Sequence, residues 1–381
     1  MDFDLNDEQR LLKDSVDRLM AAEYGFDKRK GYAASARGYS DTMWAKYAEL
    51  GILALPFTEA DGGIGGGPVE TMLVMEALGG AMALEPYLAT VVLAGGIIRH
   101  GASAEQRARL IPGIASGEAT FALAHQEKHS RYDLASVATT ARKDGSGWVL
   151  DGEKGLVLGG DSADHIFVTA RTAGSGRDRS GIGVFLVAAK APGVSRRGYP
   201  NQDGQRAAQF TLAGVRVDAS NAIGDPANGL PMVERVVDEA IAALCAEAIG
   251  VMSMMHTITL DYLKTRKQFG VTIGSFQAVQ HRAADMFVAL EQARSMAMFA
   301  TMMAVESNAT ERAKAMSAAK VQIGKSGRHI SHEAVQLHGG IAMTMEYSVG
   351  HAFKRMTIID RLFGDTDYHL TRLASMGGLM S

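Results

Sequence analysis

The feature that most constrains this chain is a double change in the period of its apolar residues. Up to about residue 119 they recur at helical spacing, from about Thr120 to Asn221 they alternate every second residue, and from about Leu230 the helical spacing returns. The outer segments therefore predict helices, and the middle segment predicts several short strands. Glycine and charged turns separate those strands at short spacing, which favours a barrel or a sandwich.

Local patterns predict where several helices begin and end. Asn6 with Gln9, and Ser103 with Gln106, have the spacing of a capping box, in which each side chain satisfies a backbone N–H of the first helical turn. Residues 41–55 keep a helical spacing up to the next proline, so the sequence predicts a helix over that range.

The last third of the chain predicts long helices. One runs from about Leu230 to Gly270 with little punctuation, and others are expected over 277–307 and 310–337, which are lengths that suit a bundle. The predicted fold class is α+β, with an N-terminal helical domain over residues 1–118, a middle β-barrel or sandwich domain over 119–226, and a C-terminal four-helix bundle over 227–381.

Composition argues against several classes of function. Lys and Arg total 39 against 42 Asp and Glu, and the net charge of -3 predicts no basic face for nucleic acid. The one cysteine, Cys245, rules out a disulfide framework and predicts a buried, inert thiol. An acidic start without a secretory signal, and no uncharged apolar run of about 18 residues, predict a cytoplasmic protein with no membrane span.

The corner between the first two long helices carries residues suited to ligand binding. Arg266 and Gln268 end one helix, Phe269 follows at a turn, and Gln277 begins the next helix. A guanidinium can hold a phosphate by charge-assisted hydrogen bonds, while the amide and the ring add a polar contact and a planar face. The structural alternative is a basic helix end that complements the helix dipole.

A second corner follows the third long helix. Gln336 precedes the pair Gly339 and Gly340, and two glycines let a backbone approach a ligand closely. The alternative is an ordinary helix stop.

His329 and His332 have the spacing of a metal pair, but the sequence offers no persuasive further ligands. Phosphate-loop, dinucleotide and nucleophile-elbow motifs are absent.

Together these stretches resemble the acyl-CoA dehydrogenase family over nearly the whole chain. "WAKYAELGILALPFTEADGGIGG" is similar to the family's N-terminal helix pair and glycine turn, and "GEATFALAHQEKHSRYD" to its middle-domain entrance. "GWVLDGEKGLVLGGDSADHIFVTAR" resembles the strand pair beneath the flavin, while "TRKQFGVTIGSFQ" and "QLHGG" resemble its two FAD motifs.

The resemblance implies FAD and the oxidation of an acyl-CoA to a 2,3-enoyl-CoA, in which a carboxylate takes the α proton and the β hydrogen leaves as hydride to the flavin. It also implies shared cofactor sites, hence a homo- or hetero-oligomer (a dimer or a dimer of dimers), and electron-transfer flavoprotein as acceptor. The implied FAD contacts are Arg266, Gln268, Phe269, Gln277 and Gln126, with Gln336, Gly339 and Gly340 reaching the FAD of a neighbouring subunit.

Three stretches depart from the family pattern. Leu156 and Leu158 stand where the family has a Trp and a hydrogen-bonding Thr beneath the flavin, and Tyr132 replaces a small Ser near the pyrophosphate. Gly364 stands where most members carry the catalytic Glu, and it cannot accept a proton. Asp365 is adjacent, but a shift of one residue re-aims its side chain.

The candidate bases therefore lie on the long helix. A minority of the family carries its base at the position of Ala240. Glu247, two turns further along the same face and inside an apolar run, is the first candidate; the alternative is a buried carboxylate bonded to a neighbour. Glu239 is the second candidate and otherwise is interpreted as a solvated charge.

These departures resemble the short acyl-CoA dehydrogenases of bacterial steroid or other bulky-acyl catabolism. Some members of that branch are heterotetramers in which one chain carries the base and the other mainly completes the FAD site. Two hypotheses follow: a catalytic chain that uses Glu247, or a partner subunit without a base of its own. A third is oxidation of another substrate, such as a nitroalkane or a hydroxylated aromatic.

Overall fold

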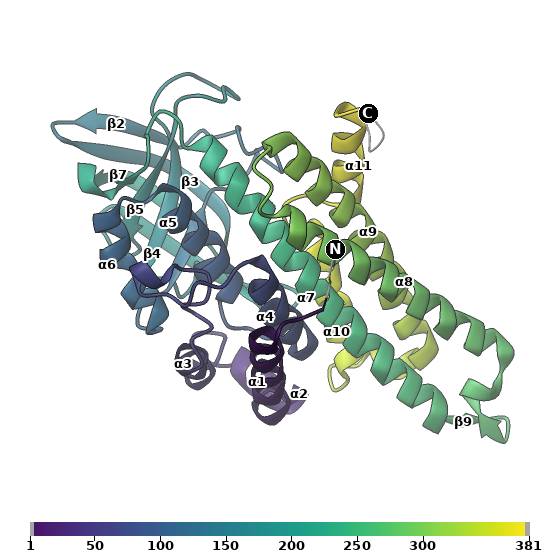
Figure 1. The fold of residues 1–381 in the computed structure, drawn as a ribbon. Helices are drawn as coiled ribbons and strands as arrows, with labels where there is room; N and C mark the ends of the chain where they lie inside the picture. The colour runs from purple at the N-terminus through teal and green to yellow at the C-terminus, as the bar shows by residue number, and fades with distance from the viewer. Residues whose placement is uncertain (1–3, 378–381) are drawn as a thin grey trace. The chain divides into compact units, whose positions relative to one another are not determined.

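The computed structural model describes residues 4–377 (Figure 1). These residues divide into two compact units. The first unit contains residues 4–30, 68–83 and 241–377, and the second contains residues 31–67 and 84–240. The α-helices are α1 Asp7–Glu23, α2 Phe26–Ala33, α3 Asp41–Glu49, α4 Pro68–Ala81, α5 Gly95–Gly101, α6 Ala104–Ala115, α7 Leu230–Thr265, α8 Gln277–Met303, α9 Ala309–His338, α10 Ser348–Arg361 and α11 Thr366–Ser375.

Side-chain caps fix the first turns of α1 and α6. Asn6 Oδ1 accepts a hydrogen bond from the Gln9 backbone N–H at 2.8 Å, and the Gln9 side chain accepts one from the Asn6 N–H at 3.1 Å. Ser103 and Gln106 make the same reciprocal pair before α6. Both predicted capping boxes are confirmed, because this device depends only on residues three apart in sequence.

The helix predicted over 41–55 is shorter than expected, since α3 ends at Glu49. Gly51 has a φ of +74°, a left-handed conformation that glycine adopts without strain and that ends a helix. Ile52 and Leu53 are fully buried within the turns that follow. Their apolar spacing therefore reflects core burial in turns, and the predicted end of this helix was wrong.

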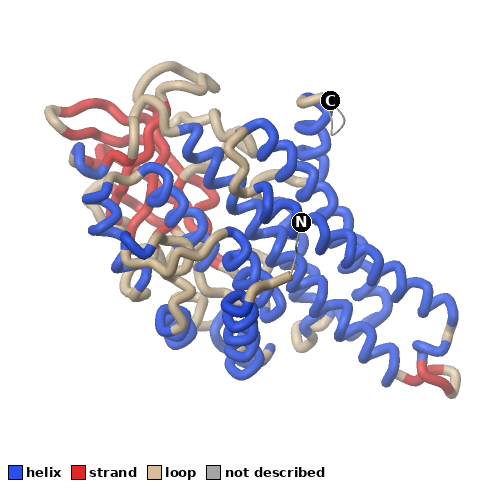
Figure 2. Tube along the Cα trace, viewed as in Figure 1, coloured by secondary structure: helices blue, strands red, loops and turns tan. Residues whose placement is uncertain are grey.

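Eight strands of the second unit form one sheet (Figure 2). Their order is β6-β7-β3-β2-β4-β5-β8, and β1 pairs with β4 in parallel. One face buries a cluster that includes Trp148, Leu150, Phe185 and Phe210. The strands are β1 Phe121–Ala124, β2 Thr140–Asp144, β3 Gly147–Leu158, β4 His165–Arg171, β5 Ile182–Ala188, β6 Val194–Pro200, β7 Arg206–Val217 and β8 Ala222–Ile223.

The period changes in the sequence thus correspond to helices, then a sheet region, then long helices, as the sequence predicts. In the C-terminal part, α9 packs against α8, α10 and α11.

Helix α7 is long and apolar enough to cross a membrane by length and composition alone, with a mean hydropathy of 1.6 over its most apolar window. However, 72% of that window is buried inside the protein, which is typical of a core helix.

Helices α4 and α7 meet backbone to backbone in the first unit. A Cβ added to Gly79 would lie 2.1 Å from the carbonyl oxygen of Glu247, and one added to Gly250 would lie 2.0 Å from the carbonyl oxygen of Glu76. Real Cβ atoms do not come this close to a carbonyl, so only glycine allows the approach. This crossing sets the position of the α7 turn that carries Glu247.

Candidate active site

The loop between α10 and α11 contains the position where the family's base is expected. Phe363 has a φ of +58° and Gly364 a φ of +117°. The second value lies outside the regions that residues with a Cβ adopt readily, so glycine suits it. A phenylalanine with positive φ is uncommon and persists only where the surrounding structure holds it. The loop is therefore a strained turn fixed by its neighbours.

The space above Gly364 is already filled. A Cβ at this position would lie 2.5 Å from Tyr368 Cδ1 and 2.6 Å from His369 Nε2. A glutamate could not be placed here unless both rings moved. Two side chains of α11 thus occupy the volume that a carboxylate side chain at position 364 would need.

His369 is fully buried, and both ring nitrogens are engaged. Its Nε2 lies 3.2 Å from the Phe363 carbonyl oxygen, which can only accept, so Nε2 carries the hydrogen. Its Nδ1 then accepts from the Ser317 hydroxyl at 3.1 Å. Burial, and after it the positive charges of Lys320 and Arg372, lower the pKa of His369 to about 3. The imidazole is therefore neutral and has no free lone pair to serve as a base.

Lys320 of α9 holds the same loop from below. Its buried ammonium donates to the carbonyl oxygens of Ile359 (2.6 Å), Asp360 (3.2 Å) and Leu362 (3.0 Å). These carbonyls belong to the C-terminal end of α10 and the start of the loop, where the helix dipole favours a cation. Burial lowers the pKa of Lys320 to about 8.

Glu247 lies in the buried part of α7 and is paired with Arg355 of α10. Arg355 Nε donates to Glu247 Oε1 at 2.6 Å, and its Nη2 donates to Oε2 at 2.8 Å. The Glu247 side chain is 6% exposed and the Arg355 side chain is 2% exposed. Both carboxylate oxygens are thus engaged by one guanidinium in a bidentate, desolvated ion pair.

The second candidate base is also committed to ion pairs. Glu239 accepts from Arg99 (2.7 Å), His100 (2.7 Å) and Arg235 (3.1 Å), and its side chain is 13% exposed. Burial alone would raise its pKa, but the bond to His100 and the nearby cations lower the pKa of Glu239 to about 2. The interpretation of Glu239 as a solvated charge was wrong, because its partners on α5 are distant in sequence.

Asp365, the carboxylate beside Gly364, caps a helix. Its Oδ1 accepts from the Tyr368 backbone N–H at 2.9 Å, at the start of α11. This bond satisfies a backbone donor that the first helical turn leaves without a partner. Asp365 therefore has a structural task of its own.

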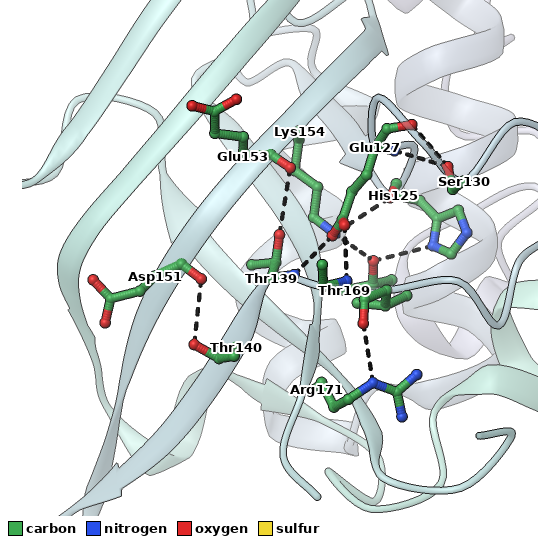
Figure 3. A network of polar contacts seen from close by, with 12 residues as sticks. His125, Glu127, Ser130, Thr139, Thr140, Asp151, Glu153, Lys154, Thr169 and Arg171 are labelled. Atoms are coloured by element: carbon green, nitrogen blue, oxygen red, sulfur yellow. Dashed lines mark hydrogen bonds and ion pairs between the residues drawn. The ribbon is translucent and has the colours of Figure 1, made fainter. Parts of the chain in front are cut away.

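A polar network lies inside the sheet of the second unit (Figure 3). Lys154 Nζ donates to Glu127 Oε1 at 2.7 Å and to Thr169 Oγ1 at 3.2 Å, and His125 Nδ1 lies 3.0 Å from the same hydroxyl. Burial lowers the pKa of Lys154 to about 8. Burial and the nearby Lys154 charge lower that of His125 to about 3. These hydrogen bonds satisfy a buried charge pair, which would otherwise be costly, and they join residues from separate strands of the sheet.

Gln126 lies between two members of that network but does not join it. The side chains of His125 and Glu127 are buried, whereas Gln126 is partly exposed, and its carbonyl accepts from the Gly155 N–H at 2.8 Å. This bond brings together the two stretches that the sequence assigns to the flavin. Leu156, next to Gly155, is partly exposed as well.

The residues predicted to contact FAD through the C-terminal motifs are exposed in the first unit. Arg266 follows α7, Gln268 and Phe269 lie in the hairpin of β9 (Lys267–Gln268) and β10 (Val271–Thr272), and Gln277 begins α8. Phe269 is 92% exposed and has a φ of +54°. Its ring packs edge-on against that of Phe276, with the centroids 6.3 Å apart, so two aromatic rings lie together at this corner.

The second predicted motif ends α9. Gln336 is exposed in the last turn, and the Gly339 N–H bonds the Val335 carbonyl to close the helix. Gly339 has a φ of +66°, and an added Cβ at Gly339 or Gly340 would meet nothing within 4 Å. The pair is both a helix stop and an open stretch of backbone, so the two interpretations of the sequence are compatible.

Sequence reasoning missed the residues that hold these groups in place. Ser317, Lys320 and Arg355 were not singled out, although each is a polar residue at a buried position of a long helix. A lysine inside the apolar run "MSAAKVQIG" was the available signal, because a buried cation requires partners. Their partners could not be found without the fold.

Family models match almost the whole chain. The acyl-CoA dehydrogenase N-terminal domain matches residues 6–118, the middle domain matches residues 122–215, and the C-terminal domain matches residues 227–377. The three matches follow the order that the sequence predicts. The predicted boundaries at 118 and 226 stay a prediction.

Individual relatives agree with the family models. The probable acyl-CoA dehydrogenase YngJ of Bacillus subtilis is 28% identical over 355 residues, covering 92% of each chain. Among solved structures, a variant of the Tcur3481-Tcur3483 steroid acyl-CoA dehydrogenase has 30% identity, 97% coverage of each chain and a TM-score of 0.87. The ChsE4-ChsE5 complex from Mycobacterium tuberculosis has 26% identity, 98% coverage of each chain and a TM-score of 0.88. This chain belongs to the acyl-CoA dehydrogenase family.

Proposed function

We propose that this chain is a subunit of an FAD-dependent acyl-CoA dehydrogenase that forms a 2,3-enoyl-CoA from a bulky acyl-CoA, and that a paralogous partner chain supplies the α-proton base. One observation carries the proposal: no carboxylate that the sequence offers as a base is available. Position 364 is a glycine covered by His369, Glu247 is bound to Arg355, and Asp365 caps α11.

The residues present fit FAD at the C-terminal motifs. Arg266 supplies a cation for a phosphate, and Gly339 and Gly340 leave open space along the backbone where a ligand can approach closely. Phe269 adds an exposed planar face. When bound, FAD supplies the acceptor for the β hydrogen as hydride. The residues proposed to hold it are Arg266, Gln268, Phe269, Gln277, Gln336, Gly339, Gly340 and Gln126.

The middle domain fits the flavin less well than the family pattern does. Leu156 and Leu158 offer no side-chain donor, so only backbone groups of this strand can bond the ring. This chain keeps the C-terminal FAD motifs but has leucines where the family has a Trp and a Thr beneath the flavin. That combination suits a chain that completes a cofactor site shared with another chain. The ChsE4-ChsE5 complex, a solved relative of two named chains, supports a heteromeric assembly.

A bulky acyl group is supported by the steroid acyl-CoA dehydrogenase among the solved relatives. Electron-transfer flavoprotein is the proposed acceptor. A cytoplasmic location is proposed with it.

The test is anaerobic spectroscopy of the chain alone and co-expressed with a paralogous chain from the same genome. We expect the lone protein to hold little flavin and to show no bleaching with a panel of acyl-CoA and steroid-CoA thioesters. The co-expressed pair should be yellow and should bleach. Stoichiometric flavin and turnover in the lone protein would reject the proposed partner role.

A second candidate function is a catalytic chain whose base is Glu247, favoured by the burial of this carboxylate in a family member that lacks the usual base. The double variant Glu247→Leu with Arg355→Met removes the ion pair without leaving one charge alone. A folded, flavin-bound double variant without turnover would identify Glu247 as the base. Retained turnover would assign the ion pair a structural role.

A further inference from the structure

The loop at residues 362–366 is shaped by α9 as well as by α11. Thr366 Oγ1 donates to Asp360 Oδ1 at 2.8 Å, which ties the two ends of the loop together. A Cβ added to Gly324 of α9 would lie 2.0 Å from Thr366 Oγ1, so this bond requires a glycine on the facing helix. With Lys320 and Ser317, three successive turns of α9 are fitted to the loop.

We infer that His369 is a positioning residue of the acyl-CoA site. It fills the volume that a side chain at position 364 would need, and its bond to the Phe363 carbonyl holds the loop so that position 364 presents backbone only. The inference rests on the proposed function, because it is the family resemblance that puts position 364 beside the reacting carbon.

The geometry of His369 suits this task. Its ring is fixed at both nitrogens, by the Phe363 carbonyl and the Ser317 hydroxyl, so the imidazole cannot rotate without losing a buried hydrogen bond. Replacement by alanine leaves the Phe363 carbonyl without its donor and empties the space above Gly364. The strained backbone at Phe363 is then free to relax, and the loop shifts.

The first experiment tests the steric part on the purified protein without substrate. Thermal unfolding is compared for the native chain, Gly364→Ala, His369→Ala and the double variant. We expect the loss in unfolding midpoint caused by Gly364→Ala to be smaller in the His369→Ala background, because the clash with the imidazole is removed and only the Tyr368 contact and the backbone strain remain. Equal losses in both backgrounds would overturn the inference. If Gly364→Ala alone yields no soluble protein, the solubility of the double variant decides. A soluble double variant supports the inference, and an insoluble one contradicts it.

The second experiment tests positioning in the assembled enzyme with an acyl-CoA that bleaches its flavin. We expect His369→Ala to raise KM for the thioester by about tenfold or more, with the FAD content unchanged. His369→Gln, whose amide can still donate to the Phe363 carbonyl, should recover most of that loss. The control is His351→Ala, which removes a partly buried histidine bonded to the Met345 carbonyl at 3.1 Å, outside the loop. Equal effects of His369→Ala and His351→Ala would reject positioning.

The two experiments separate the inference from the proposed function. One outcome is coupling between positions 364 and 369 together with no flavin bleaching by any thioester, whether the chain is alone or co-expressed with a partner. This outcome rejects acyl-CoA dehydrogenase activity and leaves the steric contact between the two positions. Normal turnover without that coupling rejects the role of His369 and leaves the activity.

Discussion

At the scale of single residues, the structure assigns tasks that composition and spacing could not. Glu247 was singled out because a carboxylate in an apolar run needs a reason, and the reason is Arg355, 108 residues away in sequence. The local pattern thus identified a residue of consequence but could not distinguish a base from half of an ion pair. The partner on α10 could be found only from the fold.

Removing one member of this pair should strongly destabilise the protein. Glu247→Ala or Arg355→Ala removes the ion-pair partner of a buried charge, and we expect a loss of about 3–5 kcal/mol in the free energy of unfolding. The double variant Glu247→Leu with Arg355→Met should recover most of it. Denaturant unfolding measures both effects. A single variant as stable as the native chain would show that the pair contributes nothing.

The exposed pair Arg179 and Glu234 is the matched control. Its nitrogen and oxygen lie 2.8 Å apart, but the arginine side chain is 66% exposed. Glu234→Ala should cost no more than about 1 kcal/mol, because solvent screens a surface pair.

Acid should destabilise the protein through its buried histidines. The folded pKa of His125 and of His369 is about 3 against 6.5 for the ordinary group, so the unfolded chain binds more protons between these values. Stability is therefore lost as the pH falls below 6.5, by about 1.4 kcal/mol per pH unit for each histidine. Denaturant unfolding at pH 7, 6 and 5 measures the slope.

The window above pH 5 isolates the histidines. Glu127 has a folded pKa of about 2 against 4.5, so its stabilising contribution is lost only below about 4.5. His369→Gln should remove one histidine's share of the slope between pH 7 and 5. An unchanged slope in that variant would contradict the assignment.

At the scale of elements, local signals predicted helix starts well and helix ends less well. The capping boxes of α1 and α6 depend on residues three apart, so sequence alone was sufficient. The end of α3 depends on Gly51, which sits inside an unbroken apolar pattern. In that stretch the apolar residues serve the core from turns, and periodicity cannot tell turns from a helix when both are buried.

The α4–α7 crossing offers a sharp test, because two adjacent glycines differ in their surroundings. A Cβ at Gly79 meets the Glu247 carbonyl at 2.1 Å, whereas one at Gly80 meets its closest neighbour, the Gly250 carbonyl, at 3.8 Å. Gly79→Ala should cost about 1–3 kcal/mol in the free energy of unfolding. Gly80→Ala should be neutral or stabilise by up to about 1 kcal/mol through helix propensity. Equal effects would mean that the helices separate easily.

At the scale of the whole molecule, the sequence was sufficient for the fold class and the family, because the order of periods and motifs extends over the entire chain. The candidate site was less predictable. The motif residues could be placed by position, but the loop at Gly364 is shaped by Ser317 and Lys320, which no motif marks. Their role depends on how α9 packs on α10 and α11.

Phe269 should matter to the assembly and little to the chain itself. It is 92% exposed at the tip of a hairpin, so Phe269→Ala should leave the unfolding midpoint of the chain unchanged and lower the FAD content of the purified, co-expressed pair. Leu11→Ala, at a residue 65% exposed on α1, is the control and should change neither. Absorbance of released flavin gives the ratio. Full FAD content in Phe269→Ala would contradict the proposed contact.

The filled space above Gly364 also bears on how this position can be engineered. A glutamate introduced at position 364 alone would lie against both Tyr368 and His369. Installing the family's usual carboxylate in this chain therefore calls for coordinated substitutions at three positions, 364, 368 and 369, rather than for a single change.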